Sequence, residues 1–268
     1  MNEKTRKIIF FDELDSTNTY AKSAPDLEDG ALVIAKRQSS GHGRMGRAFV
    51  SEEGGVYLSL VKKPALNASE LAPLTGMSAV AVSNAIERVC GVPPYIRWTN
   101  DLLFSGKKVC GILAENVFTG QNIPERVVIG VGINVCQRPE SFSEGLSASA
   151  GTLDALLGKK TDAAELALAV ADELDLASDI LNGGGREKIN EYLKKYRASC
   201  VTLGKKVSVL LPSLCNEADP REVFAKTPDL FPKAYALDID NTFGLIIKYE
   251  SGKEDVLRSG EVSVRESI

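Results

Sequence analysis

The sequence of 268 residues contains a single histidine, His42, and a single tryptophan, Trp98. One histidine leaves no second imidazole for a histidine-based metal triad, and a Ser-His-Asp set would have to be built on that one residue. The five cysteines are odd in number, widely spaced and form no C-x-x-C pair, so neither a zinc site nor a disulfide framework is indicated. The chain has no stretch of 18 apolar residues and no signal-like run at its start, which predicts a cytoplasmic protein with no membrane attachment.

The composition is that of an ordinary globular protein, with 44% hydrophobic and 25% charged residues. The 32 Lys and Arg residues against 36 Asp and Glu give a formal net charge of -4. The molecule as a whole therefore repels polyanions, and a nucleic-acid role would require a strong local basic patch. A chain of this length can form one large domain or a larger and a smaller one.

The spacing of apolar residues predicts a first region that mixes helices and strands. Short β-prone runs occupy 31–37 and 56–63, and the Val- and Ile-rich run 126–135 lacks alternation, which is typical of a strand covered on both faces. Helical spacing predicts three helices, over 71–90, over 161–182 with Thr161 as its cap, and around 189–196.

The pattern changes near Cys200. From there on, short strand-like runs separated by polar turns predict a small barrel or sandwich. Segment 211–231 shows neither pattern and predicts a long irregular loop inserted in this second region. We place the domain boundary between residues 199 and 200.

The stretch Gly41–Arg47, GHGRMGR, combines three glycines, two arginines and the only histidine between two predicted strands. Glycine permits positive φ and close backbone approach, and arginine presents a planar fork of donors that suits phosphate or carboxylate. The stretch predicts a loop that binds a small anion. Two alternatives stay open at this point: a solvated surface loop, and a basic loop that contacts nucleic acid.

Taken in order, six motifs resemble those of biotin protein ligases. GHGRMGR resembles the glycine-arginine loop of that family, usually GRGRxGR, and RWTND at 97–101 resembles its KWPND. KKVCGILAE at 107–115 resembles the strand that carries the family's essential lysine. DSTN at 15–18 resembles the segment that lies against biotin, and GVGIN at 130–134 and GEVSVR at 260–265 resemble the closing motifs of the two domains. The resemblance covers nearly the whole chain.

The resemblance implies an α+β fold, with a mixed β-sheet catalytic domain of the biotin/lipoate ligase type over 1–199 and a small SH3-like β-barrel domain over 200–268. It implies that biotin and ATP, with Mg2+, form biotinyl-5′-AMP, and that a lysine of a biotin carboxyl carrier domain then takes the acyl group. Only fourteen residues precede Asp15, so the expected form is the one without the family's N-terminal DNA-binding domain. A homodimer is one assembly that we consider.

The resemblance also implies which residues form the site. Lys108 and Arg44 are the expected catalytic cations, because a compact ammonium can neutralise an attacking carboxylate and a phosphate together. The loop 41–47 is expected to close over the adenylate and exclude water. The residues expected to bind biotin are Ser16, Thr17, Asn18, Gln38, Gly41, His42, Gly43, Arg44, Lys108 and Gly111. Those expected to contact ATP or the adenylate are Arg44, Arg47, Phe49, Asn100, Asp101 and Asn134, with Asp101 also a ligand for Mg2+.

Several of these residues have structural alternatives. Ser16 and its neighbours can cap a helix that starts near Thr19, and Asn134 can be a hydrogen-bonded structural amide. We favour core packing for Trp98. The sequence departs from the family pattern at His42, which replaces arginine, and at Phe49, which replaces a tryptophan that often stacks near the adenylate; both departures bear on adenylate retention.

Arg97 and Thr99 depart from the family's lysine and proline. Two other functions are weighed: a lipoate or octanoate ligase or transferase of the same fold, and an RNA-binding module. The complete glycine-arginine loop and the GEVSVR motif favour biotin, and the RNA-binding module lacks the basic stripe that phosphate neutralisation requires.

Overall fold

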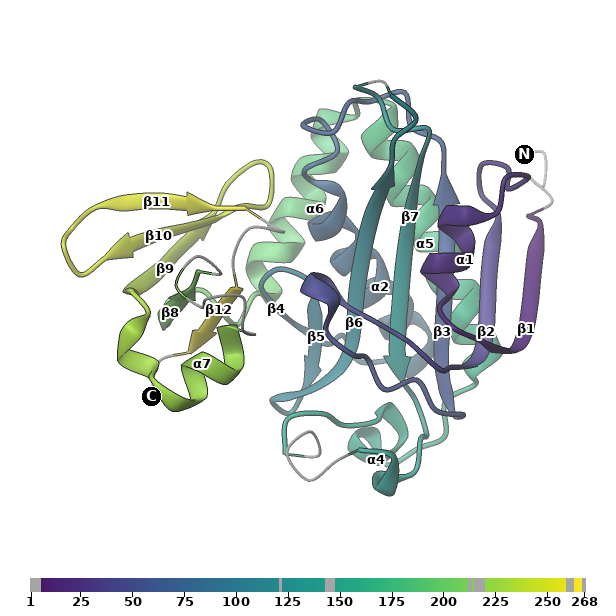
Figure 1. Cartoon of the computed structure of the whole chain (residues 1–268), viewed down its shortest axis with the longest axis horizontal. Coiled ribbons are helices and arrows are strands. Elements are labelled where there is room, and N and C mark those ends of the chain that lie inside the picture. Colours follow the sequence, from purple (N-terminus) through teal and green to yellow (C-terminus); the bar gives the residue numbers. More distant parts are fainter. Residues whose placement is uncertain are drawn as a thin grey trace.

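The computed structural model describes residues 6–120, 122–142, 148–211, 214, 220–258 and 263–266. Within them, a seven-stranded sheet and a smaller five-stranded sheet lie next to each other (Figure 1). In the part of the chain so described, every helix is too short or too polar to cross a membrane.

The large sheet has the strand order β1-β2-β3-β7-β6-β5-β4. β1 and β2 pair in parallel, and the other neighbours pair in antiparallel fashion. β7 is buried along almost its whole length, with α1 against one face and the main core against the other, which confirms the prediction of a strand covered on both faces. The strands are β1 (Ile8–Leu14), β2 (Leu32–Gln38), β3 (Gly55–Lys62), β4 (Tyr95–Arg97), β5 (Asp101–Phe104), β6 (Lys107–Val117) and β7 (Arg126–Asn134).

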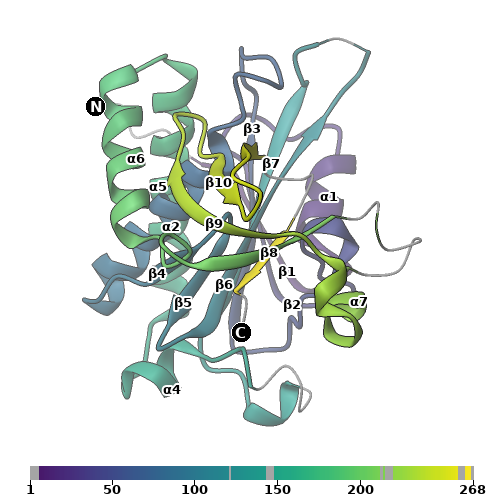
Figure 2. The ribbon, with the colours of Figure 1, turned by 90° about the vertical axis from the view of Figure 1, so that its left-hand side faces the viewer.

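Helices cover both faces of the large sheet. α1 (Thr17–Ser23) lies alone on one face, and α2 (Leu74–Cys90) and α5 (Ala163–Asn182) cover the other, with α6 (Arg186–Ser199) beside α2 (Figures 1 and 2). The apolar spacing predicted these last three helices. The described residues also form α4 (Leu153–Leu157), α7 (Pro220–Lys226) and the 3-10 turns η1 (Arg44–Gly46), η2 (Pro139–Ser141) and η4 (Pro228–Leu230).

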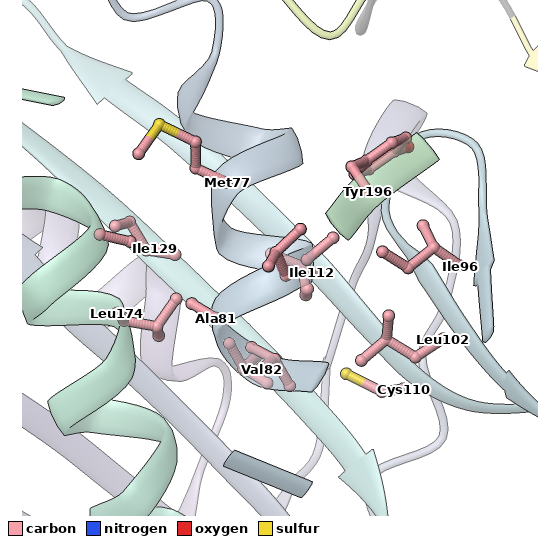
Figure 3. Packing of buried hydrophobic residues seen from close by; sticks show 14 of the residues in the cluster. Met77, Ala81, Val82, Ile96, Leu102, Cys110, Ile112, Ile129, Leu174 and Tyr196 are labelled. Carbon is pink, nitrogen blue, oxygen red and sulfur yellow. The ribbon is translucent and has the colours of Figure 1, made fainter. Parts of the chain in front are cut away.

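The main core lies between the sheet and the helices α2 and α5. Figure 3 shows Met77 and Ala81 of α2 against Ile112 of β6, Ile129 of β7 and Leu174 of α5. Small residues on α2 let this helix approach the sheet closely, and its side chains are buried along most of its length. Each fully buried Leu or Ile stabilises the fold by about 1.5–3 kcal/mol relative to exposure. The sheet that carries the site is therefore a rigid support.

The second sheet has the order β11-β10-β9-β8-β12, with antiparallel neighbours throughout. This small antiparallel sheet is consistent with the expected SH3-like domain. The predicted boundary between 199 and 200 falls where α6 ends, and the division into two domains stays a prediction. The strands are β8 (Lys206–Leu210), β9 (Lys233–Ile239), β10 (Leu245–Tyr249), β11 (Glu254–Leu257) and β12 (Ser263–Glu266).

Trp98 joins the two sheets. Its backbone N–H donates to Thr202 Oγ1 and its indole N–H to the Phe243 carbonyl, both at 3.0 Å. The side chain is only 6% exposed. Core packing, the interpretation favoured from the sequence, is confirmed, and the motif 97–101 is thereby anchored to the second region.

Three local predictions need correction. The N-cap of α5 is Asp162, not Thr161, because the Asp162 carboxylate accepts the N–H groups of Ala164 and Glu165. α1 begins at Thr17, two residues before the predicted start. The described part of 211–231 contains α7 and η4, so it is not a wholly irregular loop. There, Phe224 and Phe231 pack against each other and on Leu210, which gives this segment a small core of its own.

Candidate active site

A cleft opens on the sheet face that carries α1. The loop between β2 and β3 crosses this face in front of β5 and β6 (Figure 1, dark blue). The cleft brings together five of the six sequence motifs. Of the predicted site residues, its lining includes Ser16, Thr17, Asn18, Gln38, His42, Gly43, Arg44, Arg47, Phe49, Asn100, Asp101, Lys108 and Gly111. Gly41 and Asn134 lie outside this lining.

A second pocket adjoins the cleft. Asn134 lines it together with Val50, Phe142 and Ala150. The residues that line both cavities are Ala48, Phe49, Arg97, Asp101 and Lys108. Lys108 therefore stands at the junction of two spaces, each of which can hold a different part of a ligand.

One end of the cleft is a network of polar side chains, which we call the polar pocket: the buried Ser16, Thr17, Asn18 and Ser59 and the half-buried Gln38. Ser16 is the N-cap of α1 and accepts the Thr19 N–H, so the predicted capping role holds. Gln38 Oε1 accepts the Thr17 N–H at 2.8 Å. Ser59 Oγ lies 2.8 Å from Thr17 Oγ1 and 2.6 Å from Asn18 Oδ1. The pocket is thus preformed by hydrogen bonds between α1, β2 and β3.

The motif analysis missed Ser59 and Ser51. Ser59 is the one serine in the largely apolar run VYLSLV and is completely buried, and its hydroxyl therefore needs a partner. That rule could have flagged it. Ser51 Oγ accepts from Gln38 Nε2 at 2.9 Å and donates to the Phe49 carbonyl, which connects the polar pocket to the loop.

Glycines on β6 and β7 make room for two of these side chains. A Cβ at Gly130 would lie 2.1 Å from Asn18 Oδ1, and one at Gly132 would lie 2.5 Å from the Phe49 ring. Such distances are too short for any side chain, so GVGIN requires glycine at both positions. At Gly111 a Cβ would meet Lys108 Nζ at 3.0 Å, which is tight contact. β6 and β7 therefore carry no side chain at the positions where Asn18 of α1 and Phe49 of the loop contact the sheet.

The other end of the cleft holds what we call the cation cluster: Arg44, Arg97 and Lys108 around Asp101. Lys108 Nζ lies 2.6 Å from Asp101 Oδ1, and Arg97 Nη2 lies 2.7 Å from Asp101 Oδ2. Burial alone would raise the pKa of Asp101, but the charges and hydrogen bonds of Lys108 and Arg97 outweigh it and hold that pKa far below its usual range. Lys108 also lies over the Phe49 ring, 5.5 Å from its centroid.

The predicted Mg2+ ligand does not fit this geometry. Both oxygens of Asp101 already contact cations, and a magnesium ion bound there would compete with them. Among the described residues, His, Cys, Asp and Glu form no group of three or more that could hold a metal ion. The site offers no protein-held metal position at Asp101.

Arg44 reaches from the loop toward the motif 97–101. Its Nη1 lies 3.4 Å from Asn100 Oδ1 and 3.5 Å from Thr99 Oγ1. Burial, together with the nearby Arg47, lowers the pKa of Arg44. Asn100 in turn donates to the Ile112 carbonyl at 2.6 Å, so its amide also ties the turn to β6. The loop turns at Met45 and Gly46, whose φ angles of 58° and 68° lie in the left-handed region.

His42 points away from the cation cluster. Its Nδ1 lies 3.3 Å from the Ser40 carbonyl, and its Nε2 lies 3.9 Å from Glu115 Oε2. His42 still lines the cleft, and its expected roles in biotin binding and in adenylate retention stay predictions. Gly41 is buried, and a Cβ there would lie 2.4 Å from Ser51 Oγ, which explains the first glycine of the motif.

Asn134 shows the structural alternative that the sequence left open. Its Nδ2 donates to the Gly151 carbonyl and its Oδ1 accepts from Gln137 Nε2, both at 3.2 Å. The side chain is buried, yet it lines the second pocket beside Lys108. A role toward a bound base stays a prediction.

Comparison with known families gives a clear result. Residues 10–134 match the model of the Biotin/lipoate A/B protein ligase family. A relative from Bacillus subtilis, the bifunctional ligase/repressor BirA, is 39% identical over 160 residues, which are 59% of this chain and 49% of that protein. The match thus spans about half the length of this relative.

Two further relatives match over longer regions. The biotin protein ligase of Aquifex aeolicus, solved in complex with biotin and ATP, superposes with a TM-score of 0.76 at 29% identity, covering 97% of this chain and 99% of that one. The biotin–[acetyl-CoA-carboxylase] ligase of Mycobacterium tuberculosis is 31% identical over 203 residues, 72% of this chain and 68% of that protein. With the motifs gathered in one cleft and a relative of this identity and coverage, the chain belongs to the biotin protein ligase family.

Proposed function

We propose that the protein is an ATP-dependent ligase that attaches biotin to one lysine of a biotin carboxyl carrier domain, through biotinyl-5′-AMP. The observation that carries the proposal is the position of Lys108, at the junction between the cleft that contains the polar pocket and the second pocket. The Aquifex relative of the same fold was solved with both biotin and ATP, which supports two adjoining ligand sites.

The polar pocket suits the ureido ring of biotin. That ring has two N–H donors and one carbonyl acceptor, and the pocket offers hydroxyl, amide and backbone groups in fixed positions. Biotin would lie along the cleft with its carboxylate toward Lys108. The nucleotide would occupy the second pocket beside Phe49 and Asn134, with its α-phosphate toward the same lysine.

In the first step, a carboxylate oxygen of biotin attacks the α-phosphorus of ATP, the bond to the bridging oxygen breaks, and pyrophosphate leaves with the bonding electrons. Negative charge spreads over the phosphorus oxygens as this happens. Lys108 and Arg44 stabilise that charge, and Asp101 keeps Lys108 oriented between the two pockets. Because the cations are held before substrate arrives, little reorganisation is required.

In the second step, the amine of the carrier lysine attacks the acyl carbon, and AMP leaves. The adenylate is a reactive anhydride that water would hydrolyse, so the loop 41–47 would close over it. Gly43 and Gly46 supply the backbone freedom, and Arg44 and Arg47 supply charge on the inner side of the loop.

The remaining predictions belong to the same proposal. Any magnesium would arrive with the ATP phosphates, since Asp101 does not fit as its ligand. A cytoplasmic location agrees with the free thiols of Cys90, Cys110, Cys136 and Cys200. The absence of a DNA-binding role and the homodimer stay predictions. Lipoate or octanoate remains the alternative substrate, because ring selectivity depends on a few pocket atoms.

One assay tests the proposal. Pyrophosphate release from ATP is measured separately with biotin, lipoate and octanoate, and transfer to a purified carrier domain is followed by mass spectrometry. We expect release with biotin and labelling of a single carrier lysine. Release with lipoate and none with biotin would show that the substrate assignment is wrong.

A further inference from the structure

Glu115, a residue of β6 to which the motifs assign no role, lies next to the polar pocket. Its Oε2 accepts from Asn18 Nδ2 at 2.8 Å, and its Oε1 lies 2.7 Å from Lys22 Nζ. The His42 ring approaches the same carboxylate from the loop, with its Nε2 3.9 Å from Glu115 Oε2. Burial alone would raise the pKa of Glu115, but the hydrogen bonds from Lys22 and Asn18 outweigh it, so its pKa lies below the usual value.

An ionised Glu115 can only accept hydrogen bonds, and this fixes the Asn18 amide. The two ends of an asparagine amide have nearly the same size, so shape alone does not determine which end is the donor. Here Glu115 Oε2 and the Leu113 carbonyl, 3.3 Å away, are both acceptors on one side of Asn18. The amide NH2 must face them, and Oδ1 must face Ser59 and Gly130.

The donor and acceptor of each further hydrogen bond in the polar pocket can be assigned in the same way. Ser59 has one hydroxyl proton and two contacts. It donates this proton to Asn18 Oδ1, which is the nearer partner at 2.6 Å. Gln38 is oriented in the same way, because its Oε1 accepts the Thr17 N–H and its Nε2 therefore faces Ser51. Donors and acceptors thus have set positions from β6 to the loop.

We propose that Glu115 is a positioning residue for biotin, which acts by setting the direction of the Asn18 amide and with it the donor and acceptor pattern of the polar pocket. The inference rests on the proposed function, since a ureido ring is what would read this pattern. With Glu115 as acceptor, Asn18 presents a carbonyl oxygen beside Gly130, on the cleft, where it suits a ureido N–H. If the Asn18 amide were reversed, its NH2 group would face the ureido N–H, and two donors cannot form a hydrogen bond.

A purely structural role makes a different prediction. If Glu115 served only to pair with Lys22 and hold α1 on the sheet, then removing Lys22 would have the same effect as changing Glu115. Both side chains of that pair are about one third to one quarter exposed, and exposed pairs contribute only about 0–1 kcal/mol. Lys22→Gln removes the ion pair and leaves the bond between Glu115 and Asn18 in place, so it is the matched control.

The test uses the full chain and steady-state pyrophosphate release, with biotin and ATP varied in turn. Glu115→Gln has the same shape but can donate as well as accept, so only the longer contact with the Leu113 carbonyl still favours one direction of the Asn18 amide. We expect the KM for biotin to rise about tenfold, because one misdirected buried hydrogen bond weakens binding by roughly 5- to 100-fold. The kcat and the KM for ATP should stay within about twofold. Titration of biotin alone should show the same weakening, and Lys22→Gln should change the KM for biotin by less than about twofold.

A rescue variant makes the test specific. Asn18→Asp alone places two carboxylates in contact and should bind biotin poorly. Combined with Glu115→Gln, the new carboxylate can accept from the Gln amide and still accept from Ser59. The double variant should therefore bind biotin more tightly than Asn18→Asp alone, although the Leu113 carbonyl loses its donor.

The outcomes separate the two proposals. Inactivity of the wild-type chain with biotin would refute the proposed function and leave nothing for Glu115 to position. Activity of the wild type with an unchanged KM for biotin in Glu115→Gln, or with equal changes in both KM values, would overturn the positioning role. Should Glu115→Gln fail to fold in a thermal melt, Ser59→Ala decides instead, because loss of the other partner of Asn18 should raise the KM for biotin selectively.

Discussion

In the polar pocket, neutral groups satisfy one another before any ligand arrives, whereas in the cation cluster three positive side chains surround one carboxylate. The first arrangement costs little to keep, because each buried donor meets an acceptor within the protein. The second leaves an excess of positive charge at the junction of two pockets. The difference indicates that the two ends of the cleft bind different groups: the polar pocket suits a neutral ring, and the cation cluster suits an anion.

The largest expected effect is that of Lys108→Ala. Because Lys108 would stabilise charge that develops only in the transition state, we expect kcat for pyrophosphate release to fall by a factor on the order of 10² or more. Thermal unfolding should show a folded protein. Lys107→Ala is the matched control, since Lys107 lines neither pocket. Near-normal turnover in folded Lys108→Ala would remove this residue from the reaction and end the contrast between the two ends of the cleft.

A smaller effect is expected for Arg44→Ala. Comparison with Arg37→Ala should show whether the position of an arginine in the cleft matters or only the overall charge of the protein. Arg44 lies in the cleft near Asn100, whereas Arg37 lies outside the loop and pairs with Glu13 on the surface. We expect Arg44→Ala to lower kcat/KM for ATP by about 10- to 100-fold, in keeping with the loss of one charge-assisted contact. Arg37→Ala should stay within about twofold. Equal losses would mean that the overall charge of the chain, and not the cation cluster, attracts the nucleotide.

Asp101→Asn tests what holds the cation cluster together. We expect the free energy of unfolding at pH 7 to fall by roughly 1–2 kcal/mol, less than for a fully buried pair, because Lys108 is partly exposed. The folded pKa of Asp101 is depressed, so its contribution is complete above the unfolded value near ~3.9 and is lost as the pH falls below it.

The measurement is urea unfolding of wild type and Asp101→Asn across this range. The difference between the two proteins should be constant from pH 7 to about pH 5 and should shrink as the pH falls below about 4. A difference that does not change with pH would show that the carboxylate charge is not what holds Arg97 and Lys108.

Some elements of the fold could be predicted from the sequence and others could not. β7, α2 and α5 were predictable because long apolar patterns leave one arrangement that buries them. β1 was not, since IIFFDEL lacks alternation and lies half-exposed at the edge of the sheet, where burial does not shape the pattern. α7 was missed because its seven residues, PREVFAK, are too few to show a helical spacing of apolar side chains.

For the site, the motifs identified the residues that meet in the cleft but not those that orient them. Ser59 is 41 residues from Asn18 and Glu115 is 97 residues from it, so no local spacing indicates that they meet. His42 was placed by analogy with an arginine, but its ring faces Glu115. Partners of this kind depend on how β3 and β6 pack against α1, which only the folded chain determines.

The smallest expected effect concerns that histidine. His42 Nε2 lies 3.9 Å from Glu115 Oε2, so a permanently charged side chain at this position would pair with Glu115 and hold the loop against β6. We therefore expect His42→Arg to slow the release of biotinyl-adenylate and to reduce the labelling of a bystander protein by escaped adenylate. The effect should be a few-fold at most, because a partly exposed pair contributes under ~1 kcal/mol. Dissociation rates of the adenylate from wild type, His42→Arg and His42→Ala decide the matter. If all three proteins share one rate, His42 only spaces the glycines, and retention depends on Arg44, Arg47 and the backbone of the loop.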